Sequence, residues 1–368
     1  MARITAVIDI GSNSARMVVF EKTSRFGFHL LKEIKSKVRI SEGAYENGGA
    51  LQPEAIERAL HALLEFLSIA KAHKTRKILC VATSAVRDAP NKSEFLALVK
   101  KETGLSIKVI DGPKEAYFGA LSALNMLKIE DGITVDIGGG STEMALIKNG
   151  KIEDLISLNL GTVRLKELVF DKKLPLEEAV KFVNVELSRV PAHFKSKTII
   201  GIGGTNRALA NAIMEIDNYP IDTLHGFEFS LSGRLDFFDE IISSKVQKLK
   251  NFGIKPDRYD VIREGVLIIR SVISIVKAEK MIASGVGVRE GVFLSDLLRN
   301  QGGKFPKNFS PSLRSLVDRF SLLDDSSRRI NTISKALFKV LQPVHKLDDT
   351  ELFYLDTVAK LLNIGICL

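Results

Sequence analysis

The 368-residue chain contains only two cysteines, Cys80 and Cys367, and both have apolar neighbours. Two thiols cannot form a disulfide framework, and their separation does not match the spacing of metal ligands. We therefore expect both to be unreactive thiols in a hydrophobic core. The six histidines are scattered without metal-ligand spacing, so none is assigned a role.

No apolar run reaches the roughly 18 consecutive residues that are needed to span a bilayer. The opening residues, MARITAVIDIG, do not follow the plan of a signal peptide, because their hydrophobic stretch is patterned as a β-strand. These two absences argue against a membrane-spanning or secreted protein. They predict a cytoplasmic location.

A block of like charge is also missing, although 53 Lys and Arg residues outnumber 44 Asp and Glu residues and give a net charge of +9. Excess positive charge favours a polyanionic partner, such as nucleic acid, an acidic membrane or polyphosphate. The basic residues are dispersed, however, and no nucleic-acid-binding motif occurs among them. We therefore expect neither nucleic acid nor a membrane as the partner.

The length exceeds what one hydrophobic core usually holds and predicts two or three domains. Expected strands cover 4–10, 15–21, 77–82, 106–110, 133–137, 143–148 and 198–202. Expected helices begin at Pro53, at Asn91 through a capping box with Glu94, at Gly112 and at Asn206, and more helices follow to about Arg299. Residues 300–311 are predicted to be a linker, and the pattern after them is helical only.

One motif occurs twice, since VIDIGSNSARMVVF at 7–20 returns as VDIGGGSTEMALI at 135–147. With Asp9 aligned on Asp136, the copies share Asp-Ile-Gly, a serine at the sixth position and a methionine at the ninth. Turn chemistry alone does not require a matched carboxylate, serine and methionine. The repeat therefore indicates two related ligand sites.

Each copy is predicted to form a strand, a glycine turn and a second strand. A glycine turn lets backbone N–H groups converge on an anion, and hydroxyl groups add donors. We expect the two turns to face each other across a cleft and to bind one phosphate-bearing ligand from both sides. The candidate phosphate-binding residues are Gly11, Ser12, Asn13, Ser14 and Arg16 in the first copy and Gly138, Gly139, Gly140, Ser141 and Thr142 in the second.

Carboxylates at the turns are the candidate metal ligands. Asp9 and Asp136 lead the two turns, and Glu143 follows the second. Mg²⁺ prefers a few such oxygens together with water and the phosphate of the substrate. Glu143 stands where the first copy has Arg16, so the halves are expected to differ in role: Arg16 binds phosphate, whereas Glu143 orients water or metal. An exposed strand charge is the alternative for Glu143.

The chain carries a series of six motifs: VIDIGSNSARMVV (7–19), ATSAVRDAPN (82–91), IDGPKEA (110–116), VDIGGGSTE (135–143), GIGGTNRA (201–208) and SGVGVREGVF (284–293). Their order and spacing, through about residue 300, resemble the exopolyphosphatase/guanosine pentaphosphate phosphohydrolase family of the actin, sugar-kinase and heat-shock chaperone superfamily. The resemblance implies an α/β fold with two ribonuclease-H-like domains of duplicated actin-like design, at 1–125 and 126–300, facing across a cleft. A linker and a partial helical module, at 301–368, follow.

The resemblance also implies roles for individual residues. Glu115 matches the general base of the family, Arg87 its phosphate-neutralising arginine and Glu143 an acidic site residue. From its position alone, a glutamate in the first turn of a helix is also a candidate capping residue, and the alternative for Arg87 is a strand-end salt bridge. Both alternatives stay open at this stage.

Two further motifs are weaker signals. Gly203, Gly204 and Thr205, after Gly201, form a third glycine turn between a strand and a helix, where a helix N-terminus can bind phosphate. It is not a dinucleotide-binding fingerprint, because Asn206 replaces the third glycine. The stretches Ser284-Gly285 and Arg289-Glu290-Gly291 match the end-of-domain motif of the family, where packing and ligand contact are equally open.

Family members with a C-terminal extension resemble the His-Asp metal-hydrolase fold, which has a histidine-aspartate pair before Ile-Gly. This chain has Leu362 and Asn363 at that place, in AKLLNIG. Leucine cannot ligate a metal and asparagine lacks the charge, so the module is predicted to be a degenerate one with a structural or substrate-tunnel role. The apolar last residues, NIGICL, predict a truncated chain.

The leading hypothesis is a Mg²⁺-dependent phosphohydrolase that removes the terminal phosphate of inorganic polyphosphate, of guanosine pentaphosphate, or of both. One alternative is a kinase or ATPase of the same superfamily. Another is a non-catalytic sensor that binds guanosine tetraphosphate or pentaphosphate. The resemblance leaves a homodimer open.

Overall fold

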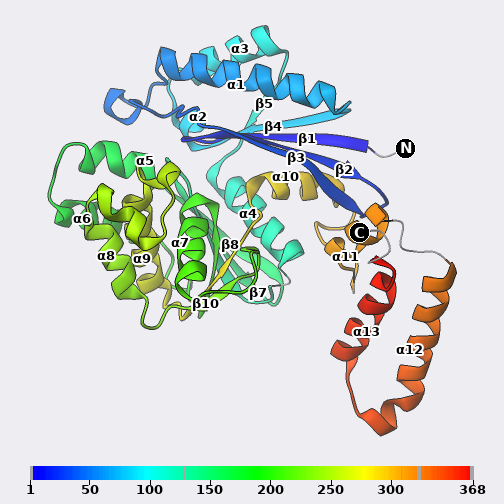
Figure 1. Cartoon of the computed structure of the whole chain (residues 1–368). Helices are drawn as coiled ribbons and strands as arrows, with labels where there is room; N and C mark the ends of the chain where they lie inside the picture. The colour runs from blue at the N-terminus through cyan, green and yellow to red at the C-terminus, as the bar shows by residue number, and fades with distance from the viewer. Residues whose placement is uncertain (1–2, 128, 308, 321–324, 365–368) are drawn as a thin grey trace.

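The computed structural model describes residues 3–127, 129–307, 309–320 and 325–364. They form two mixed β-sheets with helices and a C-terminal helical segment, which confirms the expected α/β fold (Figure 1). No helix in these ranges combines the length and hydropathy needed to cross a bilayer. Cys367 and the apolar chain end, for which the sequence makes predictions, lie outside the described residues.

The first sheet has the strand order β3-β2-β1-β4-β5. Its strands are β1 (Arg3–Ile10), β2 (Ala15–Lys22), β3 (Phe28–Ser36), β4 (Lys77–Ala82) and β5 (Ile107–Val109). The helices of this part are α1 (Pro53–Ala72), α2 (Ser84–Asp88) and α3 (Lys92–Thr103). Alternate residues of β1 face opposite sides: Ile8 packs with the core under α1 and α3, whereas Val7 faces the other core. We call this unit, residues 3–110, the first lobe.

The second sheet has the order β10-β11-β9-β6-β7-β8. Its strands are β6 (Gly132–Ile137), β7 (Thr142–Lys148), β8 (Lys151–Leu158), β9 (Thr198–Ile202), β10 (Glu228–Ser230) and β11 (Lys280–Ala283). Its helices are α5 (Thr162–Leu165), α6 (Leu176–Leu187), α7 (Gly203–Ile216), α8 (Leu235–Ser243) and α9 (Ile262–Val276). We call residues 132–283 the second lobe.

The two sheets share one plan. In each, an antiparallel meander (β1-β2-β3 or β6-β7-β8) continues beyond its first strand through two parallel strands, first β4 and then β5, or first β9 and then β11. The register is also shared, because Asp9 pairs with Arg16 across β1 and β2 just as Asp136 pairs with Glu143 across β6 and β7. The sequence repeat is therefore a repeat of structure.

Two helices fill the space between the lobes, α4 (Gly112–Met126) and α10 (Val288–Leu297). They pack closely, since a Cβ on Gly291 would lie 1.9 Å from the carbonyl oxygen of Phe118. Phe293 of α10 stacks on Phe20 of the first sheet, with ring centroids 4.3 Å apart. Ala120 of α4 packs instead on the second sheet.

Several local expectations need correction. The capping box is wrong: Asn91 makes no capping bond to α3, and its amide bonds the backbone of Leu51 on both sides, at 2.9 Å each. Helix α7 begins at Gly203, three residues before the predicted start, so the third glycine turn is the first turn of the helix. Strands β3, β8, β10 and β11 are not among the strands expected from the sequence.

The C-terminal part consists of α11 (Pro311–Phe320), α12 (Asp325–His345) and α13 (Asp349–Leu361), and the last two form a hairpin (Figure 1). Asp356 of α13 bonds Asn331 and Lys335 of α12. Leu362, at the predicted site of the lost histidine, is 53% exposed. Asn363 donates to the hydroxyl of Ser327 at 3.0 Å, which is a structural contact within the hairpin.

Candidate active site

Both glycine turns line a single cleft between the lobes. From the first turn the lining includes Asp9, Gly11, Ser12, Asn13, Ser14 and Arg16, and from the second Asp136, Gly138 and Gly139. Gly203, Gly204 and Glu115 line it as well. The remaining predicted residues do not line this cleft: Arg87, Gly140, Ser141, Thr142, Glu143 and Thr205. Two turns distant in the sequence therefore face one cleft.

The two turns close in the same way. The Gly11 N–H donates to the Ser14 carbonyl at 3.2 Å, and the Gly138 N–H donates to the Ser141 carbonyl at 2.9 Å. The amides between them donate none of the backbone bonds found in loops and turns of the described residues, so they are available to an anion, as an anion-binding nest requires. The Ser12 hydroxyl also bonds that of Ser84, with 3.0 Å between the oxygens.

The second turn is packed more tightly than the first. A Cβ on Gly139 would lie 2.7 Å from the Cβ of Ser12, and a Cβ on Gly140 would lie 2.2 Å from the hydroxyl oxygen of Tyr45. Glycine is therefore needed because the first lobe presses on this turn. Thr142, which was expected to bind phosphate, is buried and donates its hydroxyl proton to the Leu160 carbonyl instead.

Glu115 lies in the first turn of α4 and is 8% exposed. It is not the cap of this helix, because the Asp111 carboxylate accepts the Lys114 N–H at 2.7 Å. Burial raises the pKa of Glu115 well above its usual value, and the nearby Glu143 carboxylate raises it further, whereas Arg87 opposes the shift. A carboxylate with a raised pKa is suited to accept a proton near neutral pH.

Arg87 holds Glu115 rather than lining the cleft. Its Nη1 lies 3.0 Å from Glu115 Oε2, and its Nε lies 3.2 Å from Asp88 Oδ1. Behind them, Glu143 is 2% exposed and accepts a bond of 2.7 Å from the Ser157 hydroxyl. Burial raises the pKa of Glu143 to about 7. Glu143 is thus a buried carboxylate and not an exposed strand charge.

The two leading aspartates have the character of cation ligands. Burial raises the pKa of Asp9 to about 6, against the opposing charges of Arg289 and Arg16, and burial also raises the pKa of Asp136. Asp9 Oδ1 is buried without a hydrogen-bond partner in the described residues. A hard cation in the cleft would satisfy this oxygen and keep both carboxylates ionised.

The described residues contain no cluster of three or more acidic, histidine or cysteine side chains that could hold a metal ion by themselves. Mg²⁺ does not need one, because it commonly uses one or two protein carboxylates and takes its other ligands from water and substrate phosphate. Asp9 and Asp136 fit that role better than Glu143, which does not line the cleft.

Three further arginines line the cleft and were not assigned a role from the sequence: Arg207, Arg258 and Arg289. Arg207 and Arg289 stand inside quoted motifs, so the motifs could have revealed them. Arg258 belongs to no motif and lies in a short turn after Pro256. A Cβ on Gly204 would lie 2.7 Å from the Arg258 Nη1. The Nη2 of the same guanidinium donates to Thr205 Oγ1 at 3.4 Å.

A second hollow adjoins the cleft and shares Arg16, Gly204, Arg207 and Arg258 with it. Lys35 and Lys255 add two more cations to its lining, and Asp257 is the acidic residue there. The positive charge of the cleft therefore continues outward beyond the two turns. Such a surface suits an anion with several charges in a row.

Comparison with known proteins agrees with the motifs. Residues 18–300 match the sequence model of the Ppx/GppA phosphatase family. A curated relative, the bifunctional 3-dehydroquinate synthase/phosphatase of Fusobacterium nucleatum, is 32% identical over 291 residues, which are 73% of this chain and 43% of the relative. The chain thus spans less than half the length of that protein.

Solved structures give the same result. A Ppx/GppA family member from Aquifex aeolicus is 31% identical, with a TM-score of 0.68 over 82% of this chain and 99% of the other. An exopolyphosphatase from Cytophaga hutchinsonii, 23% identical, shares the fold with a TM-score of 0.73 over 80% and 98% of the two chains. The family resemblance inferred from the motifs is confirmed, and this chain belongs to the Ppx/GppA phosphatase family.

Proposed function

We propose that this chain is a phosphohydrolase that releases the terminal phosphate of inorganic polyphosphate, of guanosine pentaphosphate, or of both, by Mg²⁺-assisted attack of water. The observation that carries the proposal is the convergence of two glycine turns, several arginines and the buried Glu115 on one cleft. Anion binding and proton abstraction are the two tasks that phosphoanhydride hydrolysis sets an enzyme.

The turns and the arginines bind and place the phosphates in this proposal. Backbone N–H groups of the two turns approach the terminal phosphate from opposite lobes, and Arg16, Arg207 and Arg258 neutralise charge along the chain behind it. Guanidinium groups suit this task because their planar forks match phosphate oxygens. The continuous basic lining supports a substrate with several phosphates in a row.

Glu115 is proposed to be the general base. It takes a proton from water as the water oxygen bonds to the terminal phosphorus, and the bond from that phosphorus to the bridging oxygen breaks. The products are inorganic phosphate and a chain shorter by one phosphate. Arg87 orients the Glu115 carboxylate through their ion pair. Mg²⁺, held by Asp9 and Asp136, would neutralise charge on the phosphate oxygens.

The test is phosphate release from long-chain polyphosphate and, separately, from guanosine pentaphosphate, with Mg²⁺ present. Release from at least one substrate is expected, and a chelator should abolish it. In water enriched in ¹⁸O, the label should enter the released phosphate; a kinase would instead place phosphate on a second product. If neither substrate yields phosphate while a control phosphatase releases it, the proposal fails.

The same assay separates an enzyme from a sensor. A protein that only binds guanosine tetraphosphate or pentaphosphate would leave both substrates intact while retaining affinity for the nucleotide. Comparing turnover of the two substrates on one preparation also decides which of them is preferred.

A further inference from the structure

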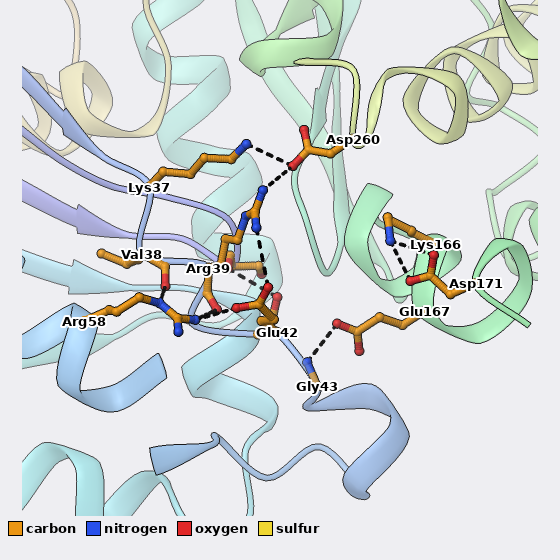
Figure 2. Close-up of polar contacts among 12 residues, drawn as sticks. Lys37, Val38, Arg39, Glu42, Gly43, Arg58, Lys166, Glu167, Asp171 and Asp260 are labelled. Atoms are coloured by element: carbon orange, nitrogen blue, oxygen red, sulfur yellow. Dashed lines mark hydrogen bonds and ion pairs between the residues drawn. The ribbon is translucent and has the colours of Figure 1, made fainter. Parts of the chain in front are cut away.

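The lobes also meet outside the cleft, through the carboxylate of Glu167. This residue lies in a π-helical turn of the second lobe, Lys166–Phe170, and is 8% exposed. Its Oε1 accepts the Gly43 N–H at 3.0 Å and its Oε2 accepts the Tyr45 N–H at 3.2 Å. Figure 2 shows the side chain reaching from one lobe to the backbone of the other. Isolated π-helical turns of this kind are frequent at functional positions.

The backbone that Glu167 grips belongs to the interlobe loop, which we define as residues 40–50. This loop touches both glycine turns. Ser41 donates from its N–H and its hydroxyl to the Ser12 carbonyl of the first turn, each at 3.2 Å. Tyr45 reaches the second turn, where its hydroxyl occupies the space that a Cβ on Gly140 would need. The position of the loop therefore fixes the spacing of the turns.

The Glu167 contact sets the cost of burying a carboxylate against two hydrogen bonds to backbone N–H groups. Burial raises the pKa of Glu167, which means that the charged form loses solvation in the closed arrangement. The two backbone N–H groups offset that loss and oppose the shift. When the lobes separate, the carboxylate and the two backbone N–H groups are all hydrated again. Because the net contribution of such hydrogen bonds is small, they hold two lobes together reversibly.

Other interlobe contacts are weaker. Asp260 of the second lobe lies 2.9 Å from Lys37 Nζ and 3.0 Å from Arg39 Nη2 of the first (Figure 2). These side chains are 27% to 42% exposed, and exposed ion pairs contribute little. Arg164 lies over the Tyr45 ring at 4.4 Å and pairs with the partly exposed Asp88 carboxylate of the first lobe at 3.1 Å. Among these contacts, Glu167 makes the buried, bidentate one.

We propose that Glu167 is a positioning residue that latches the lobes together: by holding the interlobe loop, it keeps both glycine turns on one phosphate chain. It lines no part of the cleft that holds Glu115, so it acts through the loop and not on the reacting atoms. The kinetic part of this inference rests on the proposed function, whereas the part that concerns the distance between the lobes does not.

The first experiment measures the distance between the lobes. Spin labels are attached through Glu57→Cys on α1 and Val185→Cys on α6, both at exposed positions, in a Cys367→Ser background. Glu167→Ala should shift the distance distribution towards longer values. Glu186→Ala is the matched control, because Glu186 also accepts a backbone N–H, from Asn159 at 3.1 Å, but within the second lobe. The latch is refuted if Glu167→Ala keeps the wild-type distribution.

The second experiment measures steady-state kinetics on the substrate that the enzyme hydrolyses. If the closed population falls to about a tenth, the apparent affinity falls about tenfold, so Glu167→Ala should raise KM by that factor and change kcat much less. Its pH profile should stay that of the wild type, because Glu115 is untouched. A loss of kcat at unchanged KM contradicts the latch. If wild-type protein hydrolyses neither substrate, the proposed function fails while the distance measurement still decides on the latch.

Discussion

The two glycine turns have the same backbone and different surroundings. The first runs Gly-Ser-Asn-Ser and pairs Asp9 with Arg16, whereas the second runs Gly-Gly-Gly-Ser and pairs Asp136 with Glu143. A duplicated hairpin has thus kept its leading carboxylate and reversed the charge at the partner position. The difference teaches that backbone geometry supplies anion binding in both halves, while the partner position is free to specialise.

The glycines of the second turn have a separate cause. Gly139 and Gly140 stand where the first turn has Ser12 and Asn13, and side chains of the first lobe fill the space that their Cβ atoms would take. The matched glycines Gly11 and Gly138 meet only their own turns, since a Cβ there would lie 3.4 Å and 3.1 Å from the carbonyl oxygens of Ser14 and Ser141. The two additional glycines therefore identify the second turn as the one that packs closely against the other lobe.

If the acidic side of the site does the chemistry and the basic side does the binding, Glu115→Gln should remove turnover and leave binding. We expect kcat to fall about a hundredfold or more, since a positioned base contributes that much. Phosphate release gives kcat, and equilibrium binding of the substrate gives affinity. Arg16→Ala is the counterpart, with affinity reduced more than kcat. Unchanged phosphate release in Glu115→Gln would remove the assignment of the base.

The shared part of the repeat should be equivalent in both copies. Met17 and Met144 are both fully buried, one in the core of each lobe. Met17→Ala and Met144→Ala should each lower the free energy of unfolding by about 2 to 5 kcal/mol, because each leaves a cavity. Chemical denaturation measures the two changes. A large loss in one variant and none in the other would mean that the motif serves packing in only one lobe.

The unequal packing of the turns predicts unequal tolerance. Gly140→Ala should destabilise the protein by about 1 to 3 kcal/mol, the usual cost of overpacking, since the new Cβ collides with Tyr45. Asn13→Ala, at the matching position of the first turn, should change stability by less than about 0.5 kcal/mol. Thermal unfolding compares the two. Equal effects would show that the lobes do not press on the second turn in solution.

The smallest effect concerns the pH at which the base ionises. The base works only when deprotonated, and the pKa of Glu115 is raised, so kcat/KM should be lost as pH falls through that raised value. Arg87 opposes the shift, and Arg87→Gln should therefore move this acidic limb to higher pH. The pH profile of kcat/KM measures the limb. Movement to lower pH would reverse the electrostatic account.

The sequence predicted best what depends on residues close together in the chain. The two hairpins follow from alternating strands around glycine turns, and Pro53 and Gly112 mark helix starts where the structure has them. Asn91 shows where local rules fail: the sequence around it matches a capping box, but Leu51, forty positions away, bonds both groups of its amide. Tertiary contacts of this kind leave no trace in a local pattern.

The residues of the candidate site follow the same rule: those in local motifs could be predicted, and those placed by tertiary contacts could not. The turns and Glu115 were predictable because each belongs to a motif. Arg258 was not, because it reaches the cleft from a turn with no motif, and only the close approach to Gly204 explains its place. The ion pair between Arg87 and Glu115 could not be predicted from the sequence either, since it depends on how α2 lies against α4. Burial depth, which sets the pKa of Glu115 and Glu143, depends on the whole fold.

The contact between α4 and α10 limits how the cleft can open. The chain passes from lobe to lobe in two places, through α4 and through the segment that leads into α10, and His225 bonds both, at Met126 and at Gly285. Two neighbouring attachment points define a hinge axis, so the lobes are left with rotation about one line. Glu115 lies at the other end of α4 from the Met126 contact, so an opening about this line would also change the distance between the base and the phosphate-binding walls.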